Sequence, residues 1–375
     1  MTTRKKVAVV LFNLGGPTGK KTIYPFLVNF FMDRNIIPLP VFFRFFLSRL
    51  IAIRRSTGPA LEAYSVMGGS SPLLENTLAQ QEALLKELQK NSDDDIRVYT
   101  AMRYWHPMAD SVVPQVQAFN PDELVLLSLY PQMSSTTFWS SLTDWLRVAK
   151  EYGYEKTPRV ICCYPQQKGF IAASVKNIRE KIDACKKATG RLPRLLFSAH
   201  SLPLSVIKNG DPYENQCRQT ADAIVRELNI PDLDYRICYQ SKVGVQEWLG
   251  PQTEDEIKEA SKNNIPLIIY PHAFVSEHVE TIVELGHEYR HVAEELNTPF
   301  YDVVPTVGTN PEFISGLAQM VLAHQGETGV YTETEQGDGK CSEEFIWCCQ
   351  RRAEKENIFG QDKAAQCCTT CTCSK

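Results

Sequence analysis

The chain of 375 residues lacks an apolar run long enough to cross a membrane. The longest candidate, residues 38–53, is interrupted by Arg44 and Arg49, whereas a spanning helix needs about 20 predominantly apolar residues. A secretory signal is also missing, because the apolar run at residues 7–12 falls short of a signal core of roughly 7–15 residues. We therefore expect a cytoplasmic protein.

The sequence also lacks an excess of positive charge and a disulfide framework. Its 40 basic and 44 acidic residues give a formal net charge of −4, which does not favour nucleic-acid binding. Five of the 12 cysteines are scattered over the first 340 residues, unlike the dense spacing of disulfide-rich secreted proteins. The other seven lie between Cys341 and Cys373. The length suggests about two domains, followed by a thiol-rich extension.

What the sequence does contain is an alternation of short β-branched runs with longer amphipathic segments. Continuous apolar strands that alternate with helices are typical of parallel sheets covered on both faces. We expect strands at residues 7–14, 96–103, 123–129, 159–164, 194–199, 234–240, 266–270 and 300–304. We expect helices at residues 74–90, 172–188, 213–228, 279–296 and 311–323. The eight strands predict two α/β halves, at residues 1–166 and 167–326, and residues 327–375 form the Cys-rich extension.

Two of the predicted strands lead into histidine-containing segments. Ligands of open parallel sheets bind beyond the carboxyl ends of the strands. His200 follows the fifth strand directly, and residues 272–278 follow the seventh. A histidine at a strand end is often a structural residue, but in a crevice its ordinary pKa of about 6.5 suits it to proton transfer. The sequence leaves both readings open.

Histidines and carboxylates are concentrated after the seventh strand. Four of the seven histidines fall within twenty residues, and glutamates are interleaved with them. On a helix, residues three and four apart share a face. The residues that would form one stripe are Glu277, Glu280, Glu284, His287 or Glu288, and His291. Imidazole and carboxylate together suit divalent metals such as Fe²⁺ or Zn²⁺. The alternative is a solvated charged helix face.

Five segments of the chain resemble the ferrochelatase family, in the family's order and spacing, between residue 7 and about residue 325. They are Asn13-Leu14-Gly15-Gly16-Pro17, Arg103-Tyr104-Trp105-His106-Pro107, Ser198-Ala199-His200-Ser201-Leu202-Pro203, Tyr239-Gln240-Ser241-Lys242-Val243-Gly244 and Ser276-Glu277-His278-Val279-Glu280-Thr281. The resemblance implies two Rossmann-like domains with parallel four-stranded sheets that clasp a porphyrin. It also implies an enzyme that inserts Fe²⁺ into protoporphyrin IX to form protohaem, the last step of haem biosynthesis.

Two other functions remain open for such a chain. One is a tetrapyrrole or metal carrier without turnover, and the other is a chelatase for a different tetrapyrrole or metal. Loss of free-porphyrin fluorescence over many turnovers would distinguish an enzyme from a carrier.

The resemblance also implies roles for the metal-site residues. His200 corresponds to the metal ligand or proton acceptor, and Glu280 to the opposing carboxylate. Secondary positions are Glu277, His278 and Glu284. The residue types suit the chemistry, because two pyrrole N–H protons must leave and the incoming metal must lose its water shell.

The family's porphyrin-contacting positions correspond to Ile37, Tyr64, Ser71, Arg103, Trp248 and Phe274. Trp248 could equally be a core anchor. Ser71 precedes Pro72 at a predicted helix start, a place where backbone N–H groups can accept a propionate.

The segment at residues 41–55 corresponds to the lip of the family's pocket. It is largely apolar but carries four arginines. Residues 36–55 could therefore make peripheral contact with a membrane surface, such as the inner membrane, and draw an apolar porphyrin from it. The alternative is a lid that packs down on the pocket.

Some members of the family carry a [2Fe–2S] cluster on a C-terminal extension. The candidate ligands in this chain are Cys367, Cys368, Cys371 and Cys373, with Cys341, Cys348 and Cys349 upstream. The alternative is a thiol-rich tail that binds no cluster.

Overall fold

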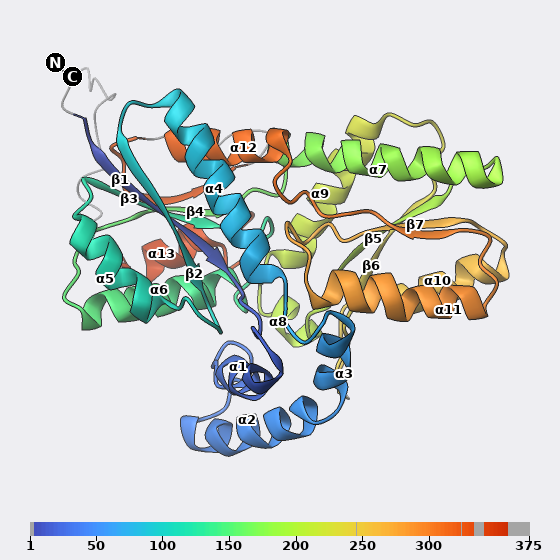
Figure 1. The fold of residues 1–375 in the computed structure, drawn as a ribbon, viewed down its shortest axis with the longest axis horizontal. Helices are drawn as coiled ribbons and strands as arrows, with labels where there is room; N and C mark the ends of the chain where they lie inside the picture. Colours follow the sequence, from blue (N-terminus) through green and yellow to red (C-terminus); the bar gives the residue numbers. More distant parts are fainter. Residues whose placement is uncertain (1–3, 245, 324, 334–340, 359–375) are drawn as a thin grey trace, which may run out of the picture.

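The computed structural model describes residues 4–244, 246–323, 325–333 and 341–358. Two parallel sheets lie side by side, each with helices on both faces, and three helices project below their junction (Figure 1). This arrangement confirms the predicted α/β class. None of the helices in these ranges is both long and apolar enough to cross a membrane.

The first sheet has the strand order β2-β1-β3-β4-β9. Its strands are β1 (Lys6–Asn13), β2 (Asp95–Met102), β3 (Glu123–Ser128), β4 (Arg159–Cys163) and β9 (Gly329–Thr332). After Lys6, every residue of β1 is buried, as expected for a central parallel strand covered on both faces. One face packs against α4 (Leu73–Asn91) and the other against α5 (Ala109–Phe119) and α6 (Phe138–Glu151).

The second sheet has the order β6-β5-β7-β8. Its strands are β5 (Arg194–His200), β6 (Tyr235–Gln240), β7 (Leu267–Tyr270) and β8 (Tyr301–Val303). The helices α7 (Lys168–Thr189) and α9 (Tyr213–Leu228) cover one face, and α10 (Thr253–Lys262) and α11 (Tyr289–Glu295) cover the other (Figure 1). β1 and β5 are internal strands of their sheets, and ligands of open parallel sheets bind at the carboxyl ends of such strands, the region called the crevice below.

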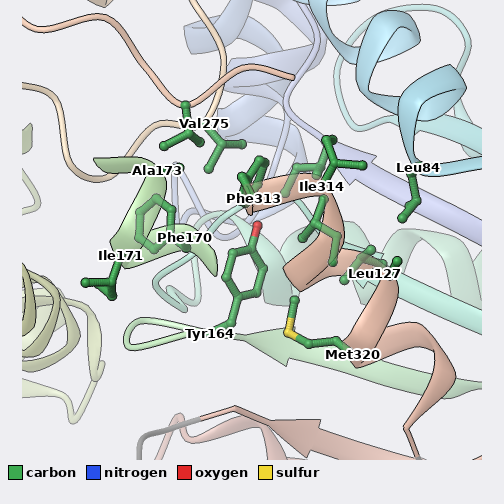
Figure 2. Close-up of a cluster of buried hydrophobic side chains, with 14 of the residues drawn as sticks. Leu84, Leu127, Tyr164, Phe170, Ile171, Ala173, Val275, Phe313, Ile314 and Met320 are labelled. Carbon is green, nitrogen blue, oxygen red and sulfur yellow. The ribbon is translucent and has the colours of Figure 1, made fainter. Parts of the chain in front are cut away.

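A single hydrophobic cluster spans both halves. Helix α12 (Pro311–Leu322) packs against α7 and α4, and its Phe313 lies with Tyr164 and Phe170 at the centre of the cluster (Figure 2). A Cβ on Gly169 would lie 2.2 Å from the carbonyl oxygen of Glu312, so α7 and α12 approach more closely than any larger residue would allow. The two halves therefore share a core, although the division at 166–167 falls between β4 and α7.

The first sheet has five strands, so the prediction of four in each sheet was wrong for this half. The fifth strand, β9, lies beyond residue 326 and pairs in parallel with β4, with Val330 opposite Val160. Periodicity did not reveal it because four residues amid a polar segment carry too weak a pattern. The extension continues into α13 (Cys349–Lys355), and a disulfide joins Cys349 to Cys162 on β4.

The region predicted as one helix at residues 279–296 consists of two elements. A π-helix, η2 (Glu280–Glu288), runs directly into α11. π-Helical segments are rare and occur most often at functional sites. The remaining short elements are η1 (Lys20–Thr22) and α8 (Leu204–Lys208).

The three projecting helices are α1 (Ile23–Phe31), α2 (Val41–Ser56) and α3 (Pro59–Val66). They form a small core of their own, in which Ile23, Ala52 and Tyr64 contact the fully buried Tyr104 at the end of the first sheet. This core anchors the projection to the mouth of the crevice.

Candidate functional site

His200 and Glu280 meet at the carboxyl end of the second sheet. His200 is the last residue of β5, and Glu280 is the first residue of η2, which follows β7 through a loop. His200 Nδ1 lies 2.9 Å from Glu280 Oε2. Their side chains are 37% and 21% exposed, so the pair is held in place yet accessible.

The electrostatics of this pair favour its charged form. Burial opposes a charge on either side chain, but each partner compensates the other. Despite burial, the Glu280 carboxylate raises the pKa of His200 above its ordinary value. Likewise, the imidazole of His200 outweighs burial and lowers the pKa of Glu280 to about 2. The site therefore holds an anionic oxygen donor, the Glu280 carboxylate, beside an imidazole whose affinity for a proton is increased.

His278 lies buried in the loop before η2. Its ring packs on Phe274, with ring centroids 4.4 Å apart, and its Nδ1 has no hydrogen-bond partner among the described residues. Burial lowers the pKa of His278, so the ring is neutral and can offer a nitrogen lone pair. The neighbouring Glu277 is hydrogen-bonded to the main chain instead: its Oε1 accepts from the N–H of Thr306 at 2.7 Å.

Glu284 lies one turn beyond Glu280 and accepts four hydrogen bonds. Gln240 Nε2 donates to it at 3.1 Å, the main-chain N–H of Ser241 at 2.7 Å, and Tyr289 Oη at 3.1 Å. The hydroxyl of Ser241 is the fourth donor. Burial and the nearby Glu280 raise the pKa of Glu284. These donors fix the orientation of the second carboxylate and tie η2 to the end of β6.

The predicted ligand stripe divides into two parts. Glu280 and Glu284 face the crevice, whereas His287, Glu288 and His291 are exposed. His291 pairs with Glu295 at 3.2 Å on the outer surface. The outer part is a solvated charged face, which was the alternative interpretation of the whole stripe.

The predicted porphyrin-contacting residues occupy different environments around the crevice. Tyr64 is buried, and the charge of Glu280 adds to burial in raising its pKa, so α3 lies near the metal-site pair. Ile37 and Trp248 are half-buried, and within the part of the chain that the structure describes the indole N–H of Trp248 has no hydrogen-bond partner. Phe274 is half-buried against His278. Of these side chains, Tyr64 lies near Glu280 and Phe274 lies against His278.

Two polar residues of that set are engaged with the protein itself. Arg103 Nη2 lies 3.1 Å from the buried carboxylate of Asp33, and its Nε donates to Ser140 Oγ at 2.7 Å. Ser71 Oγ accepts from the N–H of Leu73, at the start of α4, at 3.3 Å. A Cβ on Gly16 would lie 2.6 Å from Ser71 Cβ, so glycine is required there for this close approach.

Sequence reasoning missed the donors that surround Glu284. Gln240 and Ser241 were recognised as part of a motif, but a motif carries no information on which carboxylate they contact. Tyr289 is reached only because the π-helix joins α11 without a break.

The structure also brings together, near the end of β4, Cys163 and two of the upstream cysteines named from the sequence, Cys341 and Cys348. Gln216 Nε2 lies 3.4 Å from Cys163 Sγ and 3.5 Å from Cys341 Sγ. A hydrogen bond from Cys341 lowers the pKa of Cys348 despite burial, while the same hydrogen bond and burial raise the pKa of Cys341. Within the described ranges, no three or more His, Cys, Asp or Glu side chains are grouped to hold a single metal ion. The predicted ligands Cys367, Cys368, Cys371 and Cys373 lie outside those ranges.

The comparison with protein families decides the identity of the chain. The family model described as Ferrochelatase matches residues 6–325, which include both sheets apart from β9. The chain belongs to the ferrochelatase family. Members of this family are lyases that insert Fe²⁺ into protoporphyrin to form haem, and this confirms the activity expected from the sequence.

Individual ferrochelatases match over nearly their whole length. The ferrochelatase of Rickettsia felis is 43% identical over 346 residues, which cover 92% of this chain and 98% of the relative. The ferrochelatase of Wolbachia pipientis wMel is 45% identical over 317 residues, covering 84% and 99%. The solved structure of SirB from Bacillus subtilis with Fe³⁺ has a TM-score of 0.47 at 11% identity, covering 84% of this chain and 94% of SirB. That likeness is too distant to bear on function.

Proposed function

We propose that this ferrochelatase inserts Fe²⁺ at the His200–Glu280 pair. The observation that carries the proposal is the 2.9 Å contact between Nδ1 and Oε2 at the open end of a parallel sheet. An imidazole with a raised pKa can accept a pyrrole proton, and a carboxylate can replace water around the incoming ion. Fe²⁺ is a substrate here, and the two pyrrole protons leave as it enters the ring.

His278, Glu277 and Glu284 are proposed as secondary residues of this site. His278 can offer its unpartnered nitrogen to the metal. Glu277 and Glu284 hold the loop and helix on either side of Glu280 through their contacts with Thr306 and Ser241.

Protoporphyrin IX is proposed to bind between the projecting helices and the second sheet. The proposed contacts are Ile37, Tyr64, Ser71, Arg103, Trp248 and Phe274. Burial of Tyr64 beside the charge of Glu280 supports a ring site that faces the pair. Ser71 and Arg103 are the polar members of this set and are proposed to meet the propionates.

The test of the metal-site proposal is turnover with protoporphyrin and Fe²⁺ under anaerobic conditions. We expect His200→Ala and Glu280→Ala to abolish insertion and to leave porphyrin binding intact in a fluorescence titration. His291→Ala is the matched control, because it removes an exposed imidazole that also pairs with a glutamate. Normal turnover in His200→Ala or Glu280→Ala would refute the role of that residue.

We propose further that α2 contacts an anionic membrane surface. Phe42, Phe46 and Leu50 are 65%, 57% and 67% exposed, whereas Ser48 and Ala52 are fully buried on the opposite side. The helix contains four arginines and no acidic residue. An amphipathic helix of this kind lies in the interface, its apolar face toward the lipid. This exposure favours the interfacial interpretation over a lid packed on the pocket.

Flotation with anionic phosphatidylglycerol vesicles tests this surface. The double variant Phe42→Ser, Phe46→Ser should lose vesicle binding, and neutral phosphatidylcholine vesicles should bind the unaltered protein less. Leu78→Ser is the matched control, since Leu78 is an exposed apolar residue on α4. Equal flotation of all three proteins would exclude the membrane role of α2.

For the extension, we propose a [2Fe–2S] cluster. Such a cluster needs four thiolates. Gln216 contacts Cys163 and Cys341, and Cys341 hydrogen-bonds Cys348, whose lowered pKa favours the thiolate that ligation requires. The remaining ligand would come from the predicted set Cys367, Cys368, Cys371 and Cys373.

The assay measures the content of iron and acid-labile sulfide in anaerobically purified protein. We expect the Cys163→Ser, Cys341→Ser and Cys348→Ser variants each to lose the visible absorption of the cluster. Cys185→Ser removes a buried thiol that contacts Thr189 and serves as the control. Active protein that contains no iron and no labile sulfide would exclude the cluster. If all three variants keep the cluster absorption, Cys163, Cys341 and Cys348 are not its ligands.

A further inference from the structure

Gln240 links the strand that carries His200 to the helix that carries Glu280. It is the last residue of β6, is completely buried, and lies opposite His200 in the parallel pairing of β5 with β6. Its position alone is unremarkable, because a glutamine at a strand end can be an ordinary structural residue. The contacts of its amide distinguish it.

On the β5 side, Gln240 forms hydrogen bonds with Ser198, two residues before His200, and with Ser201, the residue after it. Its Oε1 accepts a hydrogen bond from Ser198 Oγ at 2.6 Å. Its main-chain carbonyl accepts from the N–H of Ser201 at 2.8 Å. Together with the parallel pairing of β5 with β6, these bonds fix the position of His200 along its strand relative to Gln240.

On the η2 side, the same amide contacts both carboxylate-bearing residues. Gln240 Nε2 donates to the main-chain carbonyl of Glu280 at 3.1 Å and to Glu284 Oε2 at 3.1 Å. Both amide protons are therefore used on η2, and the amide oxygen is used on β5. Such a fully satisfied buried amide has a single orientation, because rotating it would place its oxygen against two acceptors.

We infer that Gln240 is a positioning residue for metal insertion, one that sets the separation of His200 and Glu280 without touching either substrate. This inference rests on the proposed function of that pair. The physical reason is that the buried Gln240 amide bonds β5 through Ser198 and η2 through the carbonyl of Glu280, beside the reacting pair. Misplacing a reacting group by about 1 Å can cost on the order of 100-fold in rate.

The decisive comparison is between Gln240→Leu and Gln167→Leu. Gln167 is also a buried glutamine; its Oε1 accepts from the N–H of Phe170 at 2.8 Å, and its amide packs on Gly316 of α12. Both variants should lower the melting temperature. Only Gln240→Leu should lower kcat for Fe²⁺ insertion, by about 10- to 100-fold, with the porphyrin dissociation constant unchanged.

Gln240→Glu is a second variant, in which the new side chain has nearly the same shape as glutamine. It replaces Gln240→Leu in this test if that variant does not fold. It replaces two donors with a carboxylate that faces Glu284 and the carbonyl of Glu280, so kcat should fall further. Adding Glu284→Gln places an amide opposite a carboxylate again, and kcat should recover in part. A purely structural role would not produce this recovery.

Retention of kcat in Gln240→Leu, or an equal loss in Gln167→Leu, would overturn the inference. If His200→Ala and Glu280→Ala are inactive in the same assays, the proposed function stands and only the role of Gln240 fails. Normal turnover in those two variants would remove the proposed function, and this inference would fall with it.

Discussion

The His200–Glu280 contact should make the stability of the protein depend on pH in a defined range. The pKa of Glu280 falls from 4.5 to about 2 on folding, because His200 more than offsets the effect of burial. At about 1.4 kcal/mol for each tenfold change in proton affinity, this corresponds to roughly 3 kcal/mol of stability. Glu280 is only 21% exposed, so solvent screens the contact little.

The sign follows from the direction of the shift. A carboxyl group whose pKa is lowered by folding stabilises the protein above its unfolded value, here 4.5, and loses that contribution as the pH falls toward 2. Glu280→Gln removes the titration. The variant should therefore be less stable than the parent at pH 6, by about 3 kcal/mol, and the difference should shrink toward zero as the pH approaches 2.

Urea unfolding followed by circular dichroism at a series of pH values measures this difference. Glu288→Gln is the control, because Glu288 lies exposed on the same helix, and its curve should run parallel to that of the parent. A stability difference between the parent and Glu280→Gln that stays constant from pH 6 to 3 would refute the electrostatic account of the pair.

Three further outcomes can be measured. Gly169→Ala should destabilise the protein by about 1–3 kcal/mol in urea, because its Cβ would collide with α12, whereas Gly19→Ala meets nothing within 4 Å and should be tolerated. Phe313→Ala should cost about 3–5 kcal/mol by the same assay, since it leaves a cavity in the shared core. Asp33→Asn should raise the porphyrin KM more than it lowers kcat, because it removes the nearer of the two carboxylates that pair with Arg103; an unchanged KM would contradict this link.

Most of the fold was predictable because the strands of both sheets are parallel and largely buried. Such strands are continuous apolar runs, and all eight predicted strands are present with ends shifted by only a few residues. The fifth strand of the first sheet escaped prediction because β9 is short and half-buried, so that its pairing with β4 leaves little trace in the residue pattern.

The sequence by itself determined the residue types of the site and their place at strand ends. His200 and the glutamates after β7 were evident, since parallel topology brings the carboxyl ends of strands to one edge. Only the tertiary structure decided that Nδ1 of His200 meets Oε2 of Glu280, that the outer histidines face solvent, and that Gln240 bonds both elements. Those contacts join residues 40 to 80 positions apart, and local pattern carries no information on distances across a crevice.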